Sequence, residues 1–264
     1  MRAWLWAVRP LMRGITRVLA CSEHDAGRFR EIGFAAESVS STGNIKLDVT
    51  IPLLADAEKT KLRAELGLGE EAPVLLGSST WPGEEEALVH ALRVLREAGI
   101  AVRLLLVPRH AERRGEVEAM LKETRFSYHL RSRGSAVEEV DIAVGDTTGE
   151  LRKFTQLADV VFVGKSLPPH SEGQTPVEAA MLGRAILFGP GMSNFRPISR
   201  ELIEGNAARV VQGAEELAVV TTLLFRDQQV RRAMALAAQR WHSANQGAVA
   251  RSLAALDEEL RKLS

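Results

Sequence analysis

Polar residues that could hold an anion follow an apolar run at Gly77–Glu85. The segment reads GSSTWPGEE, and a stretch with helical spacing begins after Pro82, which suits the first turn of a helix. The hydroxyls of Ser79 and Thr80, with the backbone N–H groups that such a junction leaves unpaired, can bind a phosphate or a carboxylate. The same hydroxyls could simply cap the helix, and the segment alone favours this simpler explanation.

A second candidate is Arg109, which follows Pro108 at the end of the apolar run Val102–Val107. A guanidinium held by a rigid backbone at a strand end can donate a forked pair of hydrogen bonds to an anion. The alternative is a surface arginine that pairs with Glu112. The sequence leaves both interpretations open.

A third polar junction contains Thr147, Thr148, Gly149 and Glu150. Thr147 and Glu150 have the spacing of a capping box, in which each side chain bonds the other residue's backbone N–H. Gly149 would also let a ligand approach the backbone closely. This junction therefore has both a structural and a ligand-binding interpretation.

The fourth junction is Thr175-Pro176-Val177-Glu178, and it again has capping-box spacing. A carboxylate in the first helical turn can instead accept hydrogen bonds from the two hydroxyls of a ribose. Spacing alone favours the cap. Each of the four signals is weak by itself, but together they converge on one edge of one sheet, where a nucleotide would lie.

The elements that must position these residues alternate along the chain. Short apolar runs separated by amphipathic stretches indicate βαβ units and a Rossmann-like, doubly wound parallel sheet of the α/β class. Strands are predicted at Arg17–Ala20, Val39–Thr42, Val74–Gly77, Val102–Val107, Val160–Val163, Ala185–Phe188 and Ala208–Val211. Helices are predicted at Glu23–Ile32, Glu84–Ala98, Ala111–Thr124, Pro176–Leu182 and Phe195–Glu204, with two or three more within Gly213–Leu263.

A domain boundary is predicted near residue 56. Residues 1–56 contain two strands and two helices, too few for an independent sheet core, and residues 57–264 are predicted to form the doubly wound domain with C-terminal helices. In a sheet of this kind, ligands bind beyond the carboxyl ends of the strands.

Composition narrows the function classes. Lys+Arg and Asp+Glu are both 34, so no overall basic field recruits nucleic acid. Cys21 is the only cysteine, which excludes an intrachain disulfide framework and favours a reducing, cytoplasmic compartment. The sequence lacks the glycine fingerprints of dinucleotide and P-loop enzymes, the serine-hydrolase elbow and the common metal motifs, so no cofactor or metal is predicted.

No apolar run approaches the roughly 18 residues that cross a bilayer. The opening segment Met1–Met12 is nevertheless rich in tryptophan and leucine between arginines. It is predicted to be an amphipathic helix packed on its own domain, and the alternative is a segment that rests on an anionic membrane surface.

Eight motifs, in order, resemble the second half of the 3-deoxy-D-manno-octulosonic acid (Kdo) transferases. They are GNIKLD (Gly43–Asp48), STWPGEEE (Ser79–Glu86), VPRHAER (Val107–Arg113), GDTTGEL (Gly145–Leu151), ADVVFVGKSL (Ala158–Leu167), GQTPVEAA (Gly173–Ala180), GPGMSNF (Gly189–Phe195) and NQGAV (Asn245–Val249). The resemblance implies the C-terminal domain of an inverting glycosyltransferase with GT-B architecture, in which two Rossmann-like domains face across a cleft. It also implies Kdo transfer from CMP-Kdo to a lipid A precursor at the cytoplasmic face of the inner membrane, a step of lipopolysaccharide biosynthesis.

Site roles carried over from the family fall on the four junctions. Pro108 and Arg109 would bind the CMP phosphate or base, and Thr148, Gly149 and Glu150 would line the cytidine site. The turn from Thr175 through Pro176 and Val177 to Glu178 would hold the ribose through Glu178. Ser79 and Thr80 would face the phosphate. Trp81 stands where the family usually has histidine, and Glu172-Gly173-Gln174-Thr175 stands where it usually has Gly-Gly-His-Asn.

The resemblance also implies that the general base, a glutamate, lies in an N-terminal domain that residues 1–56 do not contain. The catalytic residue is therefore unknown from this sequence, and the chain is expected to be a fragment, a split-gene product or a mis-called start. Alone it is expected not to transfer sugar, and the N-terminal domain would have to be supplied in trans. Two alternatives stay open: a non-catalytic module that binds nucleotide sugars, and a GT-B transferase that uses another activated sugar.

Overall fold

The structure, a computed structural model, describes residue 12 and residues 14–262 and divides the chain into two compact units. One unit combines Met1–Thr50 with His242–Ser264, and the other is Ile51–Trp241. All of the predicted amphipathic segment Met1–Met12 except Met12 lies outside the described residues. The division differs from the boundary expected near residue 56, because the end of the chain belongs with the N-terminal residues rather than with the large sheet.

The larger unit is built on a seven-stranded sheet whose paired strands are all parallel. Its strands run in the order β5-β6-β4-β3-β7-β8-β9, which confirms the predicted doubly wound parallel sheet. Their bounds are β3 (Val74–Thr80), β4 (Arg103–Pro108), β5 (Tyr128–Leu130), β6 (Ile142–Val144), β7 (Val160–Val163), β8 (Ala185–Phe188) and β9 (Ala208–Val210).

The strand order reverses between β3 and β7. The connection from β3 to its neighbour β4 runs one way along the sheet, and the connection from β7 to its neighbour β8 runs the other way. Such a reversal leaves a crevice at the carboxyl ends of the two central strands, and ligands of open α/β sheets bind there. The β3–β7 pair is therefore where the fold itself favours a ligand.

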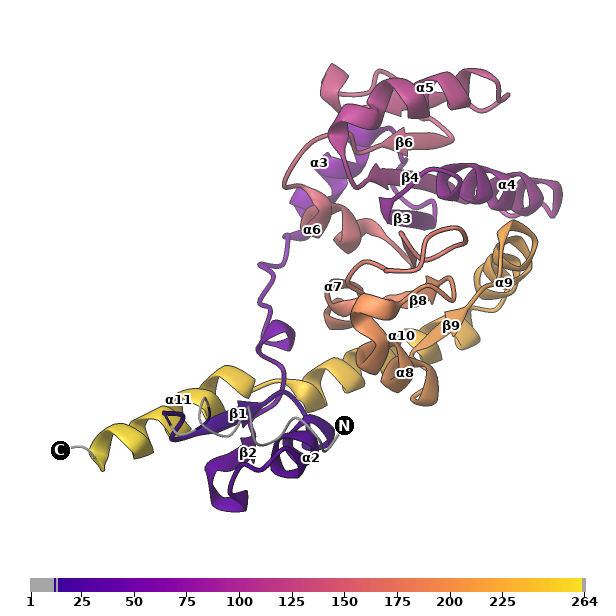
Figure 1. Cartoon of the computed structure of the whole chain (residues 1–264). Helices are drawn as coiled ribbons and strands as arrows, with labels where there is room; N and C mark the ends of the chain where they lie inside the picture. The colour runs from indigo at the N-terminus through magenta and orange to yellow at the C-terminus, as the bar shows by residue number, and fades with distance from the viewer. Residues whose placement is uncertain (1–11, 13, 263–264) are drawn as a thin grey trace. The chain divides into compact units, whose positions relative to one another are not determined.

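Helices connect these strands, and α4 packs against α9 (Figure 1). The helices of the larger unit, the last of which extends into the other unit, are α3 (Asp56–Leu66), α4 (Glu84–Glu97), α5 (Arg114–Lys122), α6 (Leu151–Phe154), α7 (Val177–Met181), α8 (Arg196–Glu204), α9 (Ala214–Arg226) and α10 (Gln228–Asn245). Short 3-10 turns precede or follow some of them at η4 (Ala111–Arg113), η6 (Thr155–Leu157) and η7 (Ser193–Phe195), and another, η5 (Arg131–Arg133), follows β5. The single helix predicted over Ala111–Thr124 is thus η4 followed by α5.

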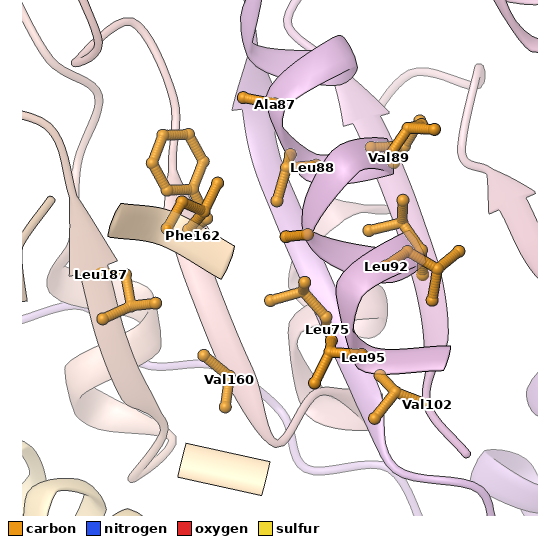
Figure 2. Close-up of a cluster of buried hydrophobic side chains, with 14 of the residues drawn as sticks. Leu75, Ala87, Leu88, Val89, Leu92, Leu95, Val102, Val160, Phe162 and Leu187 are labelled. Carbon is orange, nitrogen blue, oxygen red and sulfur yellow. The ribbon is translucent and has the colours of Figure 1, made fainter. Parts of the chain in front are cut away.

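Leucines of α4 cover one face of the central strands (Figure 2). Leu88, Leu92 and Leu95 are fully buried, and they lie beside Leu75 of β3 and Phe162 of β7. Successive residues of these strands point to opposite faces of the sheet, and both sets are buried. The sheet is therefore covered on both faces, as parallel sheets are. This packing holds the carboxyl ends of β3 and β7 in place.

The smaller unit is a pair of parallel strands covered by helices. Its elements are β1 (Val18–Ala20), α2 (Glu23–Glu31), η2 (Ala36–Ser38), β2 (Val39–Ser41), η3 (Ile45–Leu47) and α11 (Ala248–Arg261). Ala20, Ala26 and Val39 form its core, with Phe29 and Phe34 packed edge to face at 5.8 Å between ring centroids.

Hydrogen bonds explain why α11 belongs to the smaller unit. The Asp48 carboxylate accepts from the backbone N–H groups of Gly247 and Val249, both at 2.6 Å. The bond from Val249 is the main cause that lowers the pKa of Asp48. His242 bonds the Leu47 carbonyl oxygen through Nε2 at 2.9 Å. The motifs GNIKLD and NQGAV thus meet here.

None of the helices within the described residues has the length and apolar character that a membrane span requires.

Candidate functional site

The junction between β3 and α4 holds Ser79 and Thr80 in different surroundings. Ser79 is partly exposed and has a left-handed backbone, with φ of 53°, where the register of β3 against β4 shifts. Thr80 is fully buried, and its hydroxyl donates to Glu85 Oε1 at 2.7 Å. Thr80 therefore turns away from the rim where a phosphate contact was expected, and Ser79 is the member of the pair that a ligand can reach.

Capping by these hydroxyls, the simpler explanation, is not what the structure shows. Gly83 is the N-cap of α4, and its backbone N–H donates to Glu86 at 3.0 Å. Thr80 instead orients Glu85.

Glu84 fastens the end of β3 to the loop after β7. Its carboxylate is 1% exposed and accepts four backbone N–H groups at 2.8–3.0 Å, from Trp81, Lys165, Ser166 and Leu167. A buried carboxylate is stable only when hydrogen bonds replace its lost hydration, and here the backbone supplies them all. The two central strand ends are therefore held together by one side chain.

Glu85 connects the junction of β3 and α4 to η4, the 3-10 turn that follows β4. Arg113 donates to its carboxylate at 2.7 Å and to Glu116 at 2.9 Å. Burial works against the charge of the guanidinium, but the bonds to Glu116 and Glu85 hold the pKa of Arg113 above its ordinary value. Arg113 is thus already paired inside the protein.

Arg109 differs from Arg113. Its backbone N–H donates to the Thr80 carbonyl oxygen at 3.0 Å, which fixes it at the carboxyl end of β4 next to β3. Its side chain is exposed and makes no hydrogen bond or ion pair within the part of the chain that the structure describes. The pair with Glu112, the alternative left open by the sequence, is not formed, so the guanidinium can bind a ligand.

Glu150 is already paired on the rim beyond β6. Thr147 donates to its carboxylate at 2.6 Å, and Arg131 contacts the same group at 3.3 Å. These bonds outweigh burial and hold the pKa of Glu150 below its ordinary value. The bond from Thr147 joins two side chains, which is not the capping-box arrangement. Gly149 has φ of 86° and open space where a Cβ would stand.

Glu178 points away from its own helix end. Its carboxylate accepts from Arg152 of α6 at 2.7 Å, and Thr175 accepts from the Val177 N–H at 3.3 Å. The expected capping box of Thr175 and Glu178 is therefore not the arrangement found. The Glu178 side chain is 16% exposed and that of Arg152 54% exposed, so a ligand would reach this carboxylate by displacing Arg152.

The structure brings three of the predicted junctions into direct contact around the reversal of the sheet. The backbone N–H of Arg109 bonds the end of β3, and the Gly164 N–H after β7 bonds the Ser78 carbonyl oxygen at 2.8 Å. The Gln174 N–H, at the start of the junction that contains Glu178, bonds the Gly164 carbonyl oxygen at 3.0 Å. A side chain at Gly164 would strike the backbone of Ser79 and Thr80, so only glycine lets the two strand ends approach. The remaining junction, Thr147–Glu150, leads directly into α6, whose Arg152 binds Glu178.

Trp81 joins several side chains that sequence reasoning did not single out. Its ring lies 5.5 Å from the ring of His110 and 5.7 Å from that of His170, and the Lys165 ammonium lies 4.4 Å from its centroid. Lys165 also contacts Glu172 at 3.3 Å. The departure of Trp81 from the family pattern signalled a changed site, but its partners lie too far along the chain to be read from spacing.

No group of three or more histidine, cysteine or acidic residues within the described chain could hold a metal ion.

Comparisons with known proteins agree with the motifs. A family model described as 3-deoxy-D-manno-octulosonic-acid transferase matches residues 1–49. The chain is 33% identical, over 97% of its length, to the 3-deoxy-D-manno-octulosonic acid transferase of Bordetella pertussis. It is 29% identical, over 93% of its length, to that of Haemophilus influenzae. The chain spans 60% and 57% of the length of these two relatives.

Solved structures agree as well. The C-terminal CMP-Kdo binding domain of WaaA from Acinetobacter baumannii matches 70% of this chain with 96% of its own length, at 26% identity and a TM-score of 0.64. HepE from Anabaena, solved with UDP and glucose, matches 97% of this chain at 20% identity with a TM-score of 0.57, which supports the fold.

These matches place the larger unit among the Rossmann-like domains of GT-B glycosyltransferases. Within that class, the resemblance predicted from the motifs is confirmed: the chain is related to the Kdo transferases over nearly its whole length.

Proposed function

We propose that this chain binds the donor CMP-Kdo of a Kdo transferase at the carboxyl ends of β6, β4, β3 and β7. The observation that carries the proposal is Arg109, an exposed guanidinium without a carboxylate partner in the described residues, fixed beside the reversal of the sheet. The relatedness to a CMP-Kdo binding domain supports the choice of nucleotide.

The nucleotide is assigned to the four junctions as follows. Arg109 and Pro108 contact the phosphate or base, and the open backbone at Gly149 lies along the cytidine. Glu178 exchanges Arg152 for the two ribose hydroxyls, and Arg152, whose side chain is 54% exposed, is rehydrated when it is displaced. Ser79 faces the phosphate, and Thr80 acts indirectly by orienting Glu85.

We further propose that the complete reaction transfers Kdo to a lipid A precursor at the cytoplasmic face of the inner membrane. Inverting transfer needs a general base that removes the proton of the acceptor hydroxyl. In this proposal Glu84 and Glu85 are structural, and Glu150 and Glu178 belong to the donor site. The base is therefore assigned to the acceptor-binding Rossmann domain of the complete enzyme.

Another activated sugar is the second candidate donor, because Trp81 stands where the family usually has histidine and contacts His110 and Lys165. Calorimetric titration with CMP, UMP and AMP tests the nucleotide assignment. CMP is expected to bind more tightly than the other two. Equal binding of all three, or binding of none, would contradict the proposal.

A further inference from the structure

Lys165 occupies a backbone position that normally favours glycine. It directly follows Gly164 at the end of β7, and its φ is 57°, in the left-handed region. Residues other than glycine adopt this conformation at a cost, and such strained residues cluster at ligand sites. The strain at Lys165 is therefore a reason to ask what its side chain does.

The surrounding structure holds this conformation firmly. The Lys165 N–H donates to the buried Glu84 carboxylate at 2.8 Å, and its carbonyl oxygen accepts from the Gly173 N–H at 2.7 Å. With the backbone fixed on both sides, the side chain leaves in a set direction, toward Trp81. The ammonium lies 4.4 Å from the centre of that ring, where a cation is attracted to the aromatic face.

The ammonium keeps hydrogen-bonding capacity for a ligand. It has three N–H donors, and Glu172, which is 42% exposed, is its one carboxylate contact in the described residues. The nearby acids Glu84 and Glu85 are buried and already bonded. Arg109 is also unpaired within the described residues, so a second cation near Trp81 is available to an anionic ligand.

We propose that Lys165, oriented by Trp81, binds a carboxylate on the sugar unit of the donor and so selects nucleotide-activated sugar acids. This inference rests on the proposed function, which places the phosphate at Ser79, assigns the phosphate or base to Arg109, and leaves Lys165 the second negative group of the donor. In a CMP-linked sugar acid that group is the carboxylate. The second phosphate of a CDP-linked neutral sugar is the other anion that could reach this position.

Binding of CMP, CMP-Kdo and CDP-glucose to the full chain separates these sources. Lys165→Met removes the charge and keeps most of the side chain. Lys165→Gly removes both, and it also removes the left-handed strain, so this variant is expected to fold at least as well as the wild type. Lys165→Arg keeps the charge. Lys122→Met is the matched control, because Lys122 lies on α5 and pairs with Glu118.

We expect wild-type protein to bind CMP-Kdo more tightly than CMP. In Lys165→Met and Lys165→Gly, the ratio of CMP-Kdo to CMP affinity should fall roughly 10- to 100-fold, as expected for loss of a charge-assisted bond. Lys165→Arg should keep most of the ratio, and Lys122→Met all of it.

An unchanged ratio in both neutral variants overturns the inference, as does a loss seen with CDP-glucose and not with CMP-Kdo. CMP binding that is cytidine-specific, with no gain from the Kdo unit, would leave the proposed function intact and reject this inference alone. Failure of wild-type protein to bind either CMP or CMP-Kdo would reject both.

Discussion

Carboxylates serve two different purposes on the two sides of the rim. At the junction of β3 and α4, Glu84 and Glu85 are 1% exposed and hold backbone and side-chain donors permanently. At the edge formed by α6 and α7, Glu178 is paired with an arginine that is 54% exposed. Buried bonds of the first kind set geometry, whereas a pair whose arginine is exposed, as in the second kind, can be exchanged for a ligand.

This difference predicts which residues carry stability and which carry affinity. Losing a partner of a buried charge leaves several donors unsatisfied, which costs far more than losing a surface ion pair. Substitutions at Glu84 should therefore act on folding, and those at Arg109 and Glu178 on nucleotide binding.

The largest effect is expected for Glu84→Gln. The amide keeps the size of the side chain, but it brings a donor against backbone N–H groups that now need an acceptor. We expect a loss of about 2–4 kcal/mol in the free energy of unfolding, measured by urea denaturation. Glu86→Gln is the control, because Glu86 is exposed and accepts one bond. Equal, small losses in the two variants would show that Glu84 does not fasten the strand ends.

Arg109→Ala should leave stability nearly unchanged, because the side chain has no partner in the described residues. It should weaken CMP binding by about 1.5–3 kcal/mol, roughly 10- to 100-fold, since a charge-assisted contact is lost. Arg114→Ala, an exposed arginine of α5, is the matched control for both measurements. A loss of stability with unchanged CMP affinity would mean that Arg109 is structural.

Glu178→Gln should have a smaller effect on affinity. The amide can still bond a ribose hydroxyl, but it loses the charge and one acceptor. We expect CMP binding to fall by about 1 kcal/mol, roughly five-fold, with a melting shift of a few degrees. Competition between Arg152 and CMP for the Glu178 carboxylate can be checked with Arg152→Met. This variant frees the carboxylate and should not weaken CMP binding. A stability loss alone in Glu178→Gln would contradict the ribose assignment.

The smallest effect concerns pH and the smaller unit. Burial lowers the pKa of His242 below its ordinary value of 6.5, against a raising effect of the Leu47 carbonyl and Asp48. The unfolded chain therefore binds more protons than the folded one just below pH 6.5, and stability is lost as the pH falls from there. The stability difference between wild type and His242→Gln, measured by urea unfolding, should shrink between pH 7.5 and pH 5.5. A constant difference would contradict this sign.

The sheet could be predicted because its central strands are long apolar runs buried on both faces. The strands β5 and β6 were not predicted. Tyr128-His129-Leu130 is not a continuous apolar run, and the short run of β6 lies between Asp141 and Gly145. The placement of α11 also escaped, since it depends on bonds between Asp48 and the start of a helix some two hundred positions later. Secondary structure can be predicted from neighbouring residues, whereas a contact between residues so far apart in the sequence cannot.

The positions of the candidate site could be predicted for the same reason: strand ends of a parallel sheet meet at one edge. The side chains that these site residues contact could not be predicted. Glu178 and Arg152 had no shared signal in the sequence, and neither did Trp81 and Lys165, because ion pairs and ring contacts between different loops depend on three-dimensional placement. Thr80 illustrates the limit, because its type suited a phosphate and its burial decided otherwise.

A crystal structure of the chain with CMP tests the central claim most directly. We predict the phosphate or base of CMP within hydrogen-bonding distance of the Arg109 guanidinium, and its ribose hydroxyls on the Glu178 carboxylate, at the carboxyl ends of β4, β3 and β7. CMP bound with both Arg109 and Glu178 out of reach would contradict the account.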